Sequence, residues 1–233
     1  MARDAGPGRE EPRRALQRGP QAGGGLIAAD EHRRLRLEDI EDLRAYERGR
    51  QEFRARVIDL KRRRRLSVGP IVTVVFENRD TIRFQIQEMA RIEKMTSDAQ
   101  IQAELDVYNP LIPGPGELSA TLFVELTDEA SLREWLGKLV GVERALQLRL
   151  GGDAMGNGGP EVVPATPEEA HAEQLTREDA TSSVHYVRFL LGPEQIERFA
   201  RGPVTLAVDH PAYRHRTELP DEVRDELVSD LRP

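Results

Sequence analysis

The chain contains no cysteine among its 233 residues. This absence excludes disulfide bonds, zinc–thiolate sites, a cysteine nucleophile and any iron–sulfur cluster held by the chain's own cysteines. It is typical of cytoplasmic proteins, and we expect that location. No apolar run approaches the ~20 residues that a membrane-spanning helix needs. Residues 1–25 lack the apolar centre of a secretion signal, so neither membrane insertion nor export is expected.

Several motifs that accompany nucleotide chemistry and hydrolysis are also missing. The chain has no Gly-x-x-x-x-Gly-Lys-Ser/Thr loop, no Gly-x-Gly-x-x-Gly turn and no Gly-x-Ser-x-Gly elbow. These absences argue against nucleotide hydrolysis and dinucleotide-dependent oxidoreduction. Aromatic residues make up 5% of the chain and do not alternate with its basic residues, so a base-stacking surface for nucleic acid is not expected.

Charge is distributed unevenly along the chain. Residues 44–65 contain ten Lys or Arg and three Asp or Glu, whereas residues 66–233 contain 16 and 29. The acidic body would repel phosphates, so the basic cluster Lys61–Arg65 is a better candidate for contact with an acidic protein partner. Arg63 and Arg64 are its predicted contact residues. The alternative is a solvated helix end whose charge complements the helix dipole.

The composition separates a tail from a folded part. Residues 1–34 are rich in Gly, Pro and Arg without an apolar period, which predicts a disordered N-terminal extension. Residues 35–231 are predicted to form a single globular domain, with residues 151–167 as a flexible internal loop. Apolar residues three and four apart indicate a helix from Leu37 to Leu60, and an apolar run indicates a strand from Ile71 to Phe76.

The second half of the chain repeats one pattern of elements. Its strand–helix–strand units are predicted at 118–126, 128–139 and 145–150, and again at 183–191, 193–201 and 204–209. Two such units suggest an α/β or α+β fold with a mixed or mainly parallel sheet of about five strands, covered by helices. A terminal helix is predicted to end near Leu231.

Residues 82–93 fit two structures. Ile82, Phe84 and Ile86 alternate as in a strand, while Ile82, Ile86 and Met89 also lie on one face of a helix. Either Asn78 or Asp80 would make a suitable N-cap. The connection to the preceding strand lacks an Asn-Gly type of tight turn, so the pattern favours the helix.

The densest run of polar residues follows the strand at 71–76, where Glu77 ends it. We predict a ligand or partner surface formed by Asn78, Arg79, Asp80, Arg83, Gln85, Gln87 and Glu88. In the functional interpretation, the two arginines bind an anionic ligand at a helix N-terminus. In the structural interpretation, which we favour, Asn78 and Asp80 cap the helix while the arginines pair with nearby carboxylates.

His185, Asp209 and His210 come from two predicted strands of the second unit. If those strands are neighbours, two imidazoles and a carboxylate converge, and these are ligands of non-haem iron, manganese or zinc. Glu88 or Glu77 would supply another oxygen. No His-x-x-x-His or Glu-x-x-His spacing places two ligands on one helix face. The alternative is that both histidines are hydrogen-bonded structural residues.

Six stretches of the chain together carry a family resemblance. They are residues 54–61, 75–81, 84–89, 108–113, 184–189 and 209–213. Over about residues 35–231 the chain resembles a bacterial and archaeal family known as domain of unknown function 3501. The resemblance implies no reaction and no catalytic residues. It implies an association with rubrerythrin-like proteins and with iron–sulfur proteins similar to heterodisulfide reductase subunits, and hence a redox setting.

These observations lead to two hypotheses. The first is a cytoplasmic, non-catalytic accessory or partner-binding protein that serves a rubrerythrin-like or iron–sulfur oxidoreductase partner. The second is a metal-dependent enzyme or sensor built on His185, Asp209 and His210. The sequence identifies no cofactor.

Overall fold

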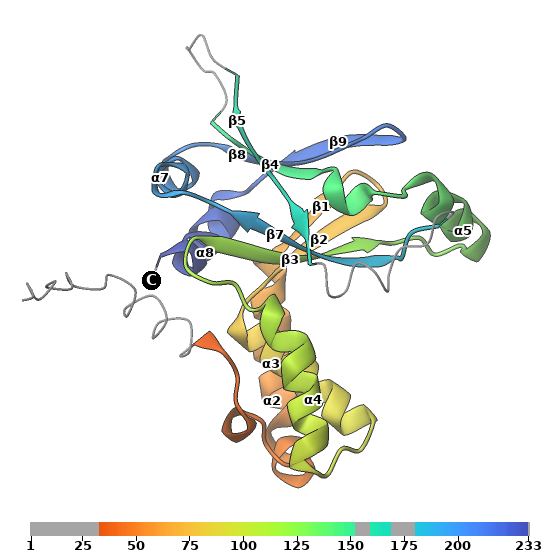
Figure 1. Ribbon diagram of the computed structural model, residues 1–233, viewed down its shortest axis with the longest axis vertical. Coiled ribbons are helices and arrows are strands. Elements are labelled where there is room, and N and C mark those ends of the chain that lie inside the picture. Colours follow the sequence, from red (N-terminus) through yellow and green to blue (C-terminus); the bar gives the residue numbers. More distant parts are fainter. Residues whose placement is uncertain (1–32, 152–158, 169–179, 233) are drawn as a thin grey trace, which may run out of the picture.

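Two antiparallel β-sheets form the centre of the protein (Figure 1). The structure is a computed structural model that describes residues 33–151, 159–168 and 180–232. The predicted disordered extension lies outside the described residues except for its last two positions. The predicted flexible loop lies partly outside them, and its described part contains two short strands.

The strands divide between the two sheets as follows. Sheet A has the order β1 (Arg65–Val68), β2 (Val72–Glu77), β3 (Glu117–Val124), β7 (Val184–Leu190) and β6 (Thr166–Pro167). Sheet B has the order β5 (Glu161–Pro164), β4 (Leu146–Leu150), β8 (Val204–His210) and β9 (Tyr213–Glu218).

The helices surround these sheets. They are α2 (Leu43–Arg62), α3 (Arg79–Ile92), α4 (Asp98–Tyr108), α5 (Glu129–Lys138), α7 (Pro193–Arg201) and α8 (Asp221–Leu231). Short 3-10 turns are η1 (Leu37–Asp39), η2 (Asn109–Leu111) and η3 (Val142–Arg144). Within the described ranges, no helix combines the length and hydrophobicity needed to cross a bilayer.

The α+β class and the single domain are confirmed, and the arrangement of the strands corrects the expected single mixed sheet. Each predicted strand–helix–strand unit is present, but its two strands belong to different sheets. β3 and β7 lie in sheet A, while the strands that follow α5 and α7, β4 and β8, lie in sheet B. The units therefore connect two sheets, and every strand pair between described residues is antiparallel.

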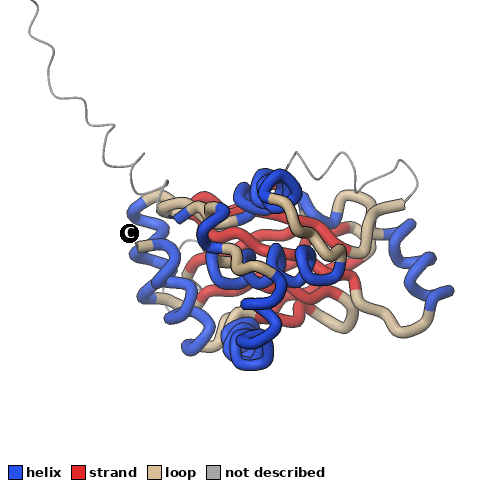
Figure 2. The backbone as a smooth tube through the Cα atoms, turned by 90° about the horizontal axis from the view of Figure 1, so that it is seen from below, coloured by secondary structure: helices blue, strands red, loops and turns tan. Residues whose placement is uncertain are grey.

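The main hydrophobic core lies between the two sheets. Alternate residues of β2, Val72, Val74 and Phe76, point into it and meet Leu146 and Leu148 of sheet B in the same buried cluster. α7 and α8 lie at one end of this sandwich and α5 at the other, as the views from the side and from below show (Figures 1 and 2). The apolar side chains of α8 join the same core, so the helix closes that end of the sandwich.

The opposite face of sheet A is also covered. Thr73, Val75 and Glu77 of β2 point away from the main core, yet all three are buried. The helices α2, α3 and α4 extend from this side of the sheet (Figure 1). The end of α2, the first turn of α3 and the end of α4 meet the sheet, because residues from these ends line one cavity with sheet residues.

A buried tyrosine connects the free edges of the two sheets. The hydroxyl of Tyr213 in β9 donates to the carbonyl of Val68, with an O–O distance of 2.7 Å, beside the turn between β1 and β2. Gly69 in this turn has a φ of +78°, and a Cβ there would lie 2.4 Å from the Tyr213 hydroxyl. Only glycine avoids both the strain and the clash.

Arg64 joins the end of α2 to α8. Its side chain is 1% exposed. It donates to Asp230 with an Nη1–Oδ2 distance of 2.6 Å and to Glu226 with an Nη2–Oε1 distance of 2.8 Å. The guanidinium is therefore neutralised inside the molecule, and Arg64 is withdrawn from the predicted contact surface for an acidic partner.

Arg64→Ala should reduce the free energy of unfolding by about 3 kcal/mol, because removing one member of a buried ion pair leaves the other charges uncompensated. Urea unfolding followed by circular dichroism measures the change. Arg62→Ala is the matched control: the Arg62 side chain is 76% exposed and, among the described residues, pairs only with Asp59, so its effect should stay within ~0.5 kcal/mol. Equal midpoints for the two variants would contradict the structural role of Arg64.

Candidate functional site

The predicted helix over residues 82–93 is confirmed as α3, with Asn78 as its N-cap. The side-chain oxygen of Asn78 accepts from the backbone nitrogens of Asp80 and Thr81 at 3.1 and 3.0 Å. The Thr81 hydroxyl oxygen accepts in return from the Asn78 nitrogen at 2.9 Å. This capping box satisfies the free N–H groups that an anionic ligand would otherwise use. Asp80 is exposed.

Three more residues of the predicted surface attach α3 to the segment before α2. Arg79 pairs with Asp39 at 2.7 Å, and Arg83 donates to the Asp39 carbonyl at 2.8 Å. Gln87 is buried and both accepts from and donates to the backbone of Glu41, at 3.0 and 2.8 Å. These contacts agree with the structural interpretation of the polar run.

Glu88 lies at the contact between α2 and α3. Its carboxylate accepts from Arg50 at 2.7 and 2.9 Å and from the Tyr46 hydroxyl at 2.7 Å. The hydrogen bonds from Arg50, together with Tyr46, lower the pKa of Glu88 to about 2 despite the opposing effect of burial. Burial and the neighbouring Glu88 raise the pKa of Tyr46, so this hydroxyl stays protonated.

The basic cluster at the end of α2 is largely paired within the protein. Arg62 and Arg63 both pair with Asp59, and Arg63 also approaches Glu226 at 3.3 Å. Arg65 donates to Glu125 at 2.7 Å, with both side chains about half exposed. Lys61, by contrast, has no ion-pair partner among the described residues, and it faces a cavity described below.

The predicted metal ligands do not converge. Asp209 and His210 are neighbours on β8 and therefore point to opposite faces of sheet B. The Nε2 of His210 donates to the Val140 carbonyl at 3.0 Å, and its Nδ1 accepts from the Ala212 nitrogen at 3.2 Å, so both ring nitrogens are occupied. The side chain of Asp209 is 49% exposed and lies 3.3 Å from Arg214.

His185 belongs to a separate buried group in sheet A. Its Nε2 lies 2.8 Å from the Thr181 hydroxyl and 2.9 Å from the Ser182 carbonyl, and its Nδ1 lies 4.0 Å from Glu143. Burial lowers the pKa of His185, and Glu143 opposes that shift. Across the described ranges no three His, Asp or Glu side chains are placed to hold a metal ion. The predicted site at His185, Asp209 and His210 is therefore not formed.

A cavity of about 220 Å³ lies between the outer face of sheet A and the ends of α2, α3 and α4. Its polar and aromatic lining comes from six elements: Lys61, Glu77, Gln85, Tyr108, Thr121 and Tyr186. Its apolar lining consists of Ile82, Leu111, Phe123 and Val184. Of the predicted surface residues, Gln85 alone lines it. Five of the six stretches that carry the family resemblance contribute lining residues.

Glu77 is the most unusual group in this cavity. The residue is 5% exposed, and its Oε1 accepts from the Thr121 hydroxyl at 2.7 Å. Its Oε2 is buried and has no hydrogen-bond partner among the described residues. A carboxylate oxygen in this state costs free energy, and most buried polar atoms in native proteins have a hydrogen-bond partner in the protein or in ordered water.

The two tyrosines of the cavity stay protonated. Burial, with Tyr108 and Glu77 nearby, raises the pKa of Tyr186 to about 12. Burial also raises the pKa of Tyr108, although a hydrogen bond with Gln85 opposes this shift. At neutral pH both phenols are uncharged, and the remaining basic and acidic side chains of the cavity are Lys61 and Glu77.

The sequence signals for this cavity were present but incomplete. Glu77 ends an otherwise apolar strand, and the outward positions of β3 and β7 carry Ser119, Thr121 and Tyr186. Polar side chains on a strand face that helices cover suggest a binding site. However, placing Thr121 opposite Tyr186 requires the strand register, which the sequence does not reveal.

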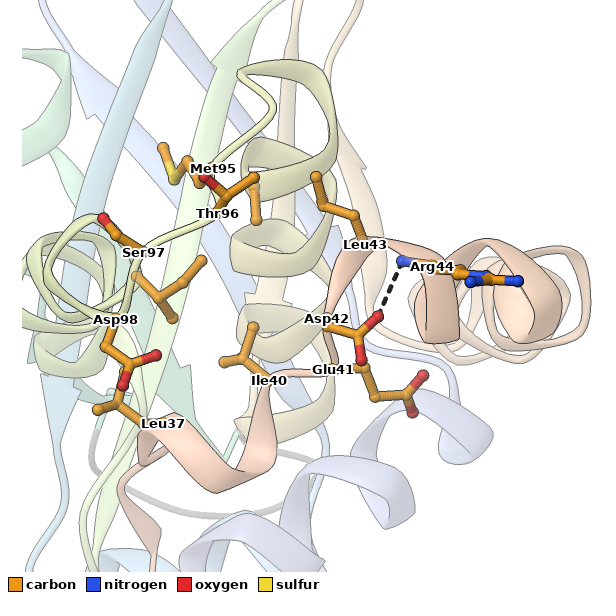
Figure 3. A pocket seen from close by; sticks show the side chains of 12 residues that line it. Leu37, Ile40, Glu41, Asp42, Leu43, Arg44, Met95, Thr96, Ser97 and Asp98 are labelled. Carbon is orange, nitrogen blue, oxygen red and sulfur yellow. Dashed lines mark hydrogen bonds between the residues drawn. The ribbon is translucent and has the colours of Figure 1, made fainter.

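A second hollow, of about 360 Å³, lies between the start of α2 and the start of α4 (Figure 3). Leu37, Ile40 and Ile101 form part of its apolar wall. The helix N-termini that open onto it are capped by their own side chains, Asp42 and Ser97. These caps compete with an anion for the N–H groups of the two first turns, and we consider the Glu77 cavity the candidate site.

Glu88 makes stability depend on pH. Its folded-state pKa lies below the ordinary value of 4.5, so its contribution is present above about pH 4.5 and is lost as the pH falls toward 2. Glu88→Gln should lower the free energy of unfolding by up to about 3 kcal/mol at pH 7, and the difference from wild type should shrink between pH 5 and pH 3. Urea unfolding at several pH values measures it.

Glu52→Gln is the control for this prediction, because Glu52 forms an exposed pair with Arg56 on the same helix α2. It should cost less than ~1 kcal/mol at any pH. A difference between Glu88→Gln and wild type that stays constant from pH 7 to pH 3 would contradict the role assigned to the Glu88 carboxylate.

Comparison with known proteins places this fold in a family. No curated protein matches the chain. A crystal structure of a protein of unknown function from Burkholderia pseudomallei is similar, with 37% sequence identity and a TM-score of 0.74, over 84% of this chain and 98% of that one. The family model for proteins of unknown function DUF3501 matches residues 34–231. The chain therefore belongs to the DUF3501 family.

Proposed function

We propose that the protein is a non-catalytic binding protein that holds a small polar molecule in the Glu77 cavity. The observation that carries this proposal is the buried Glu77 Oε2, which lacks a partner among the described residues at the wall of a 220 Å³ cavity. A bound molecule with an N–H or O–H donor would satisfy this oxygen. The free energy cost of the unpaired carboxylate would then be removed on binding.

The surroundings of Glu77 support binding rather than core packing. The Thr121 hydroxyl donates to Oε1 and orients the carboxylate, which leaves Oε2 as the oxygen without a partner among the described residues. On the same face of the sheet, Arg188 pairs with Glu117 and Glu168. Glu77 Oε2 therefore differs from the Arg188 group on the same sheet face, whose charges are compensated.

Ligand binding fits an accessory role, and the predicted partner remains a separate proposal. A rubrerythrin-like or iron–sulfur protein is suggested by the family resemblance. Arg64 is buried and the Arg63 side chain is 33% exposed, whereas the Arg62 side chain is 76% exposed although it also pairs with Asp59, so a partner that contacts the basic cluster would use Arg62. Arg62 follows Lys61, so such a partner would dock beside the cavity.

The full-length chain purified under native conditions should release a small molecule when it is denatured, measured by liquid chromatography and mass spectrometry. Gln85→Phe fills the cavity from α3 and should abolish this molecule. Gln51→Phe, an exposed position on α2, is the matched control and should retain it. Absence of the molecule from wild type, or its equal recovery from Gln85→Phe, would contradict the proposal.

A further inference from the structure

Two uncompensated charges of opposite sign line the Glu77 cavity. Glu77 comes from the end of β2, and Lys61 comes from the last turn of α2. Neither forms an ion pair with another described residue. The bases that follow Lys61 are all paired, and so is Glu88. Lys61 and Glu77 therefore differ from the paired charges on either side of them.

The remaining lining suits the uncharged middle of a ligand. Ile82, Leu111 and Val184 provide apolar contact, and Tyr108 and Tyr186 add aromatic rings with neutral hydroxyls. Aromatic rings favour a nearby organic cation. The volume is below the ~300–1,000 Å³ typical of pockets for drug-sized ligands, so a nucleotide would not fit.

Building on the proposed function, we infer that the ligand is a small zwitterion with a protonated amine at one end and a carboxylate at the other. The amine donates to Glu77 Oε2, and the carboxylate pairs with Lys61. The apolar and aromatic side chains contact the carbon chain between them. Each charge of the cavity then meets its opposite.

Other ligand classes satisfy the cavity less well. A simple anion would pair with Lys61 but would face the buried Glu77 carboxylate. A simple cation would pair with Glu77 and leave Lys61 uncompensated beside it. A metal ion would find one carboxylate here, whereas calcium takes 6–8 oxygen ligands and magnesium takes six.

The test is isothermal titration calorimetry of the full-length chain with probes of matched length. They are 5-aminopentanoate, pentylamine and pentanoate, followed by ω-amino acids of about three to six carbons to find the preferred span. 5-Aminopentanoate should bind at least ~10-fold more tightly than either singly charged probe, since each charge-assisted contact contributes about 1.5–3 kcal/mol, or roughly 10- to 100-fold.

Substitutions of Glu77 and Lys61 should distinguish the contributions of the amine and the carboxylate to the binding affinity. Glu77→Gln should weaken 5-aminopentanoate and pentylamine ~10-fold or more, and Lys61→Gln should weaken 5-aminopentanoate and pentanoate to a similar extent. Lys138→Gln is the control, because Lys138 lies on α5 and pairs with Glu134. It should change none of the affinities. Thermal unfolding of each variant checks that it is folded.

Three results would overturn this inference. The first is that pentanoate binds more tightly than 5-aminopentanoate. The second is that a folded Glu77→Gln variant binds 5-aminopentanoate as tightly as the wild type, and the third is that none of the ω-amino acids tested binds. The proposed function is judged separately by the molecule released from the native protein. A released molecule that is not a zwitterion and that Gln85→Phe abolishes would refute the ligand class while supporting the binding role.

Discussion

The alternation of side chains along β2, β3 and β7 is the constraint on which the rest of the structure depends. Successive residues of a strand point to opposite faces, so Val74 and Phe76 enter the core between the sheets while Val75 and Glu77 point away from it. The face of sheet A toward the core is mainly apolar, although it carries His185, whereas the outer face carries the buried polar side chains Glu77, Ser119 and Thr121. The outer face is covered by α2, α3 and α4, and these helices must accommodate the polar side chains of that face.

Several charged residues hold these helices in place. Arg64 fixes the end of α2 against α8, and Glu88 joins α2 to α3 through Arg50. A sequence rich in charge can suggest a binding surface where the structure contains ion pairs. Lys61 and Glu77 differ because they meet at a cavity and lack ion-pair partners in the described chain.

Local features of the fold could be predicted from the sequence, whereas the pairing of distant segments could not. Asn78 and the apolar period after it identified α3, because capping and helical periodicity act over a few residues. The strand–helix–strand units were recognised, but nothing local indicates that the second strand joins another sheet. β9 was missed because Arg214 and Arg216 alternate there with few apolar residues.

The candidate site shows the same limit. Glu77 was recognised at the end of its strand, but Thr121 and Tyr186 approach it only through the register of three strands. His185, Asp209 and His210 have the chemistry of metal ligands, yet the fold separates them, since His185 lies in sheet A and the other two lie in sheet B. Residue type suggested a metal site, and topology determined that none forms there.

The central claim is that Glu77 binds a ligand and that its buried carboxylate destabilises the ligand-free protein. The most direct measurement is the thermal unfolding of ligand-free Glu77→Gln beside the ligand-free wild type. The account predicts a higher melting temperature for the variant, because a neutral amide of the same shape relieves the buried, half-satisfied carboxylate. A clearly lower melting temperature would show that the carboxylate stabilises the fold, and would contradict the account.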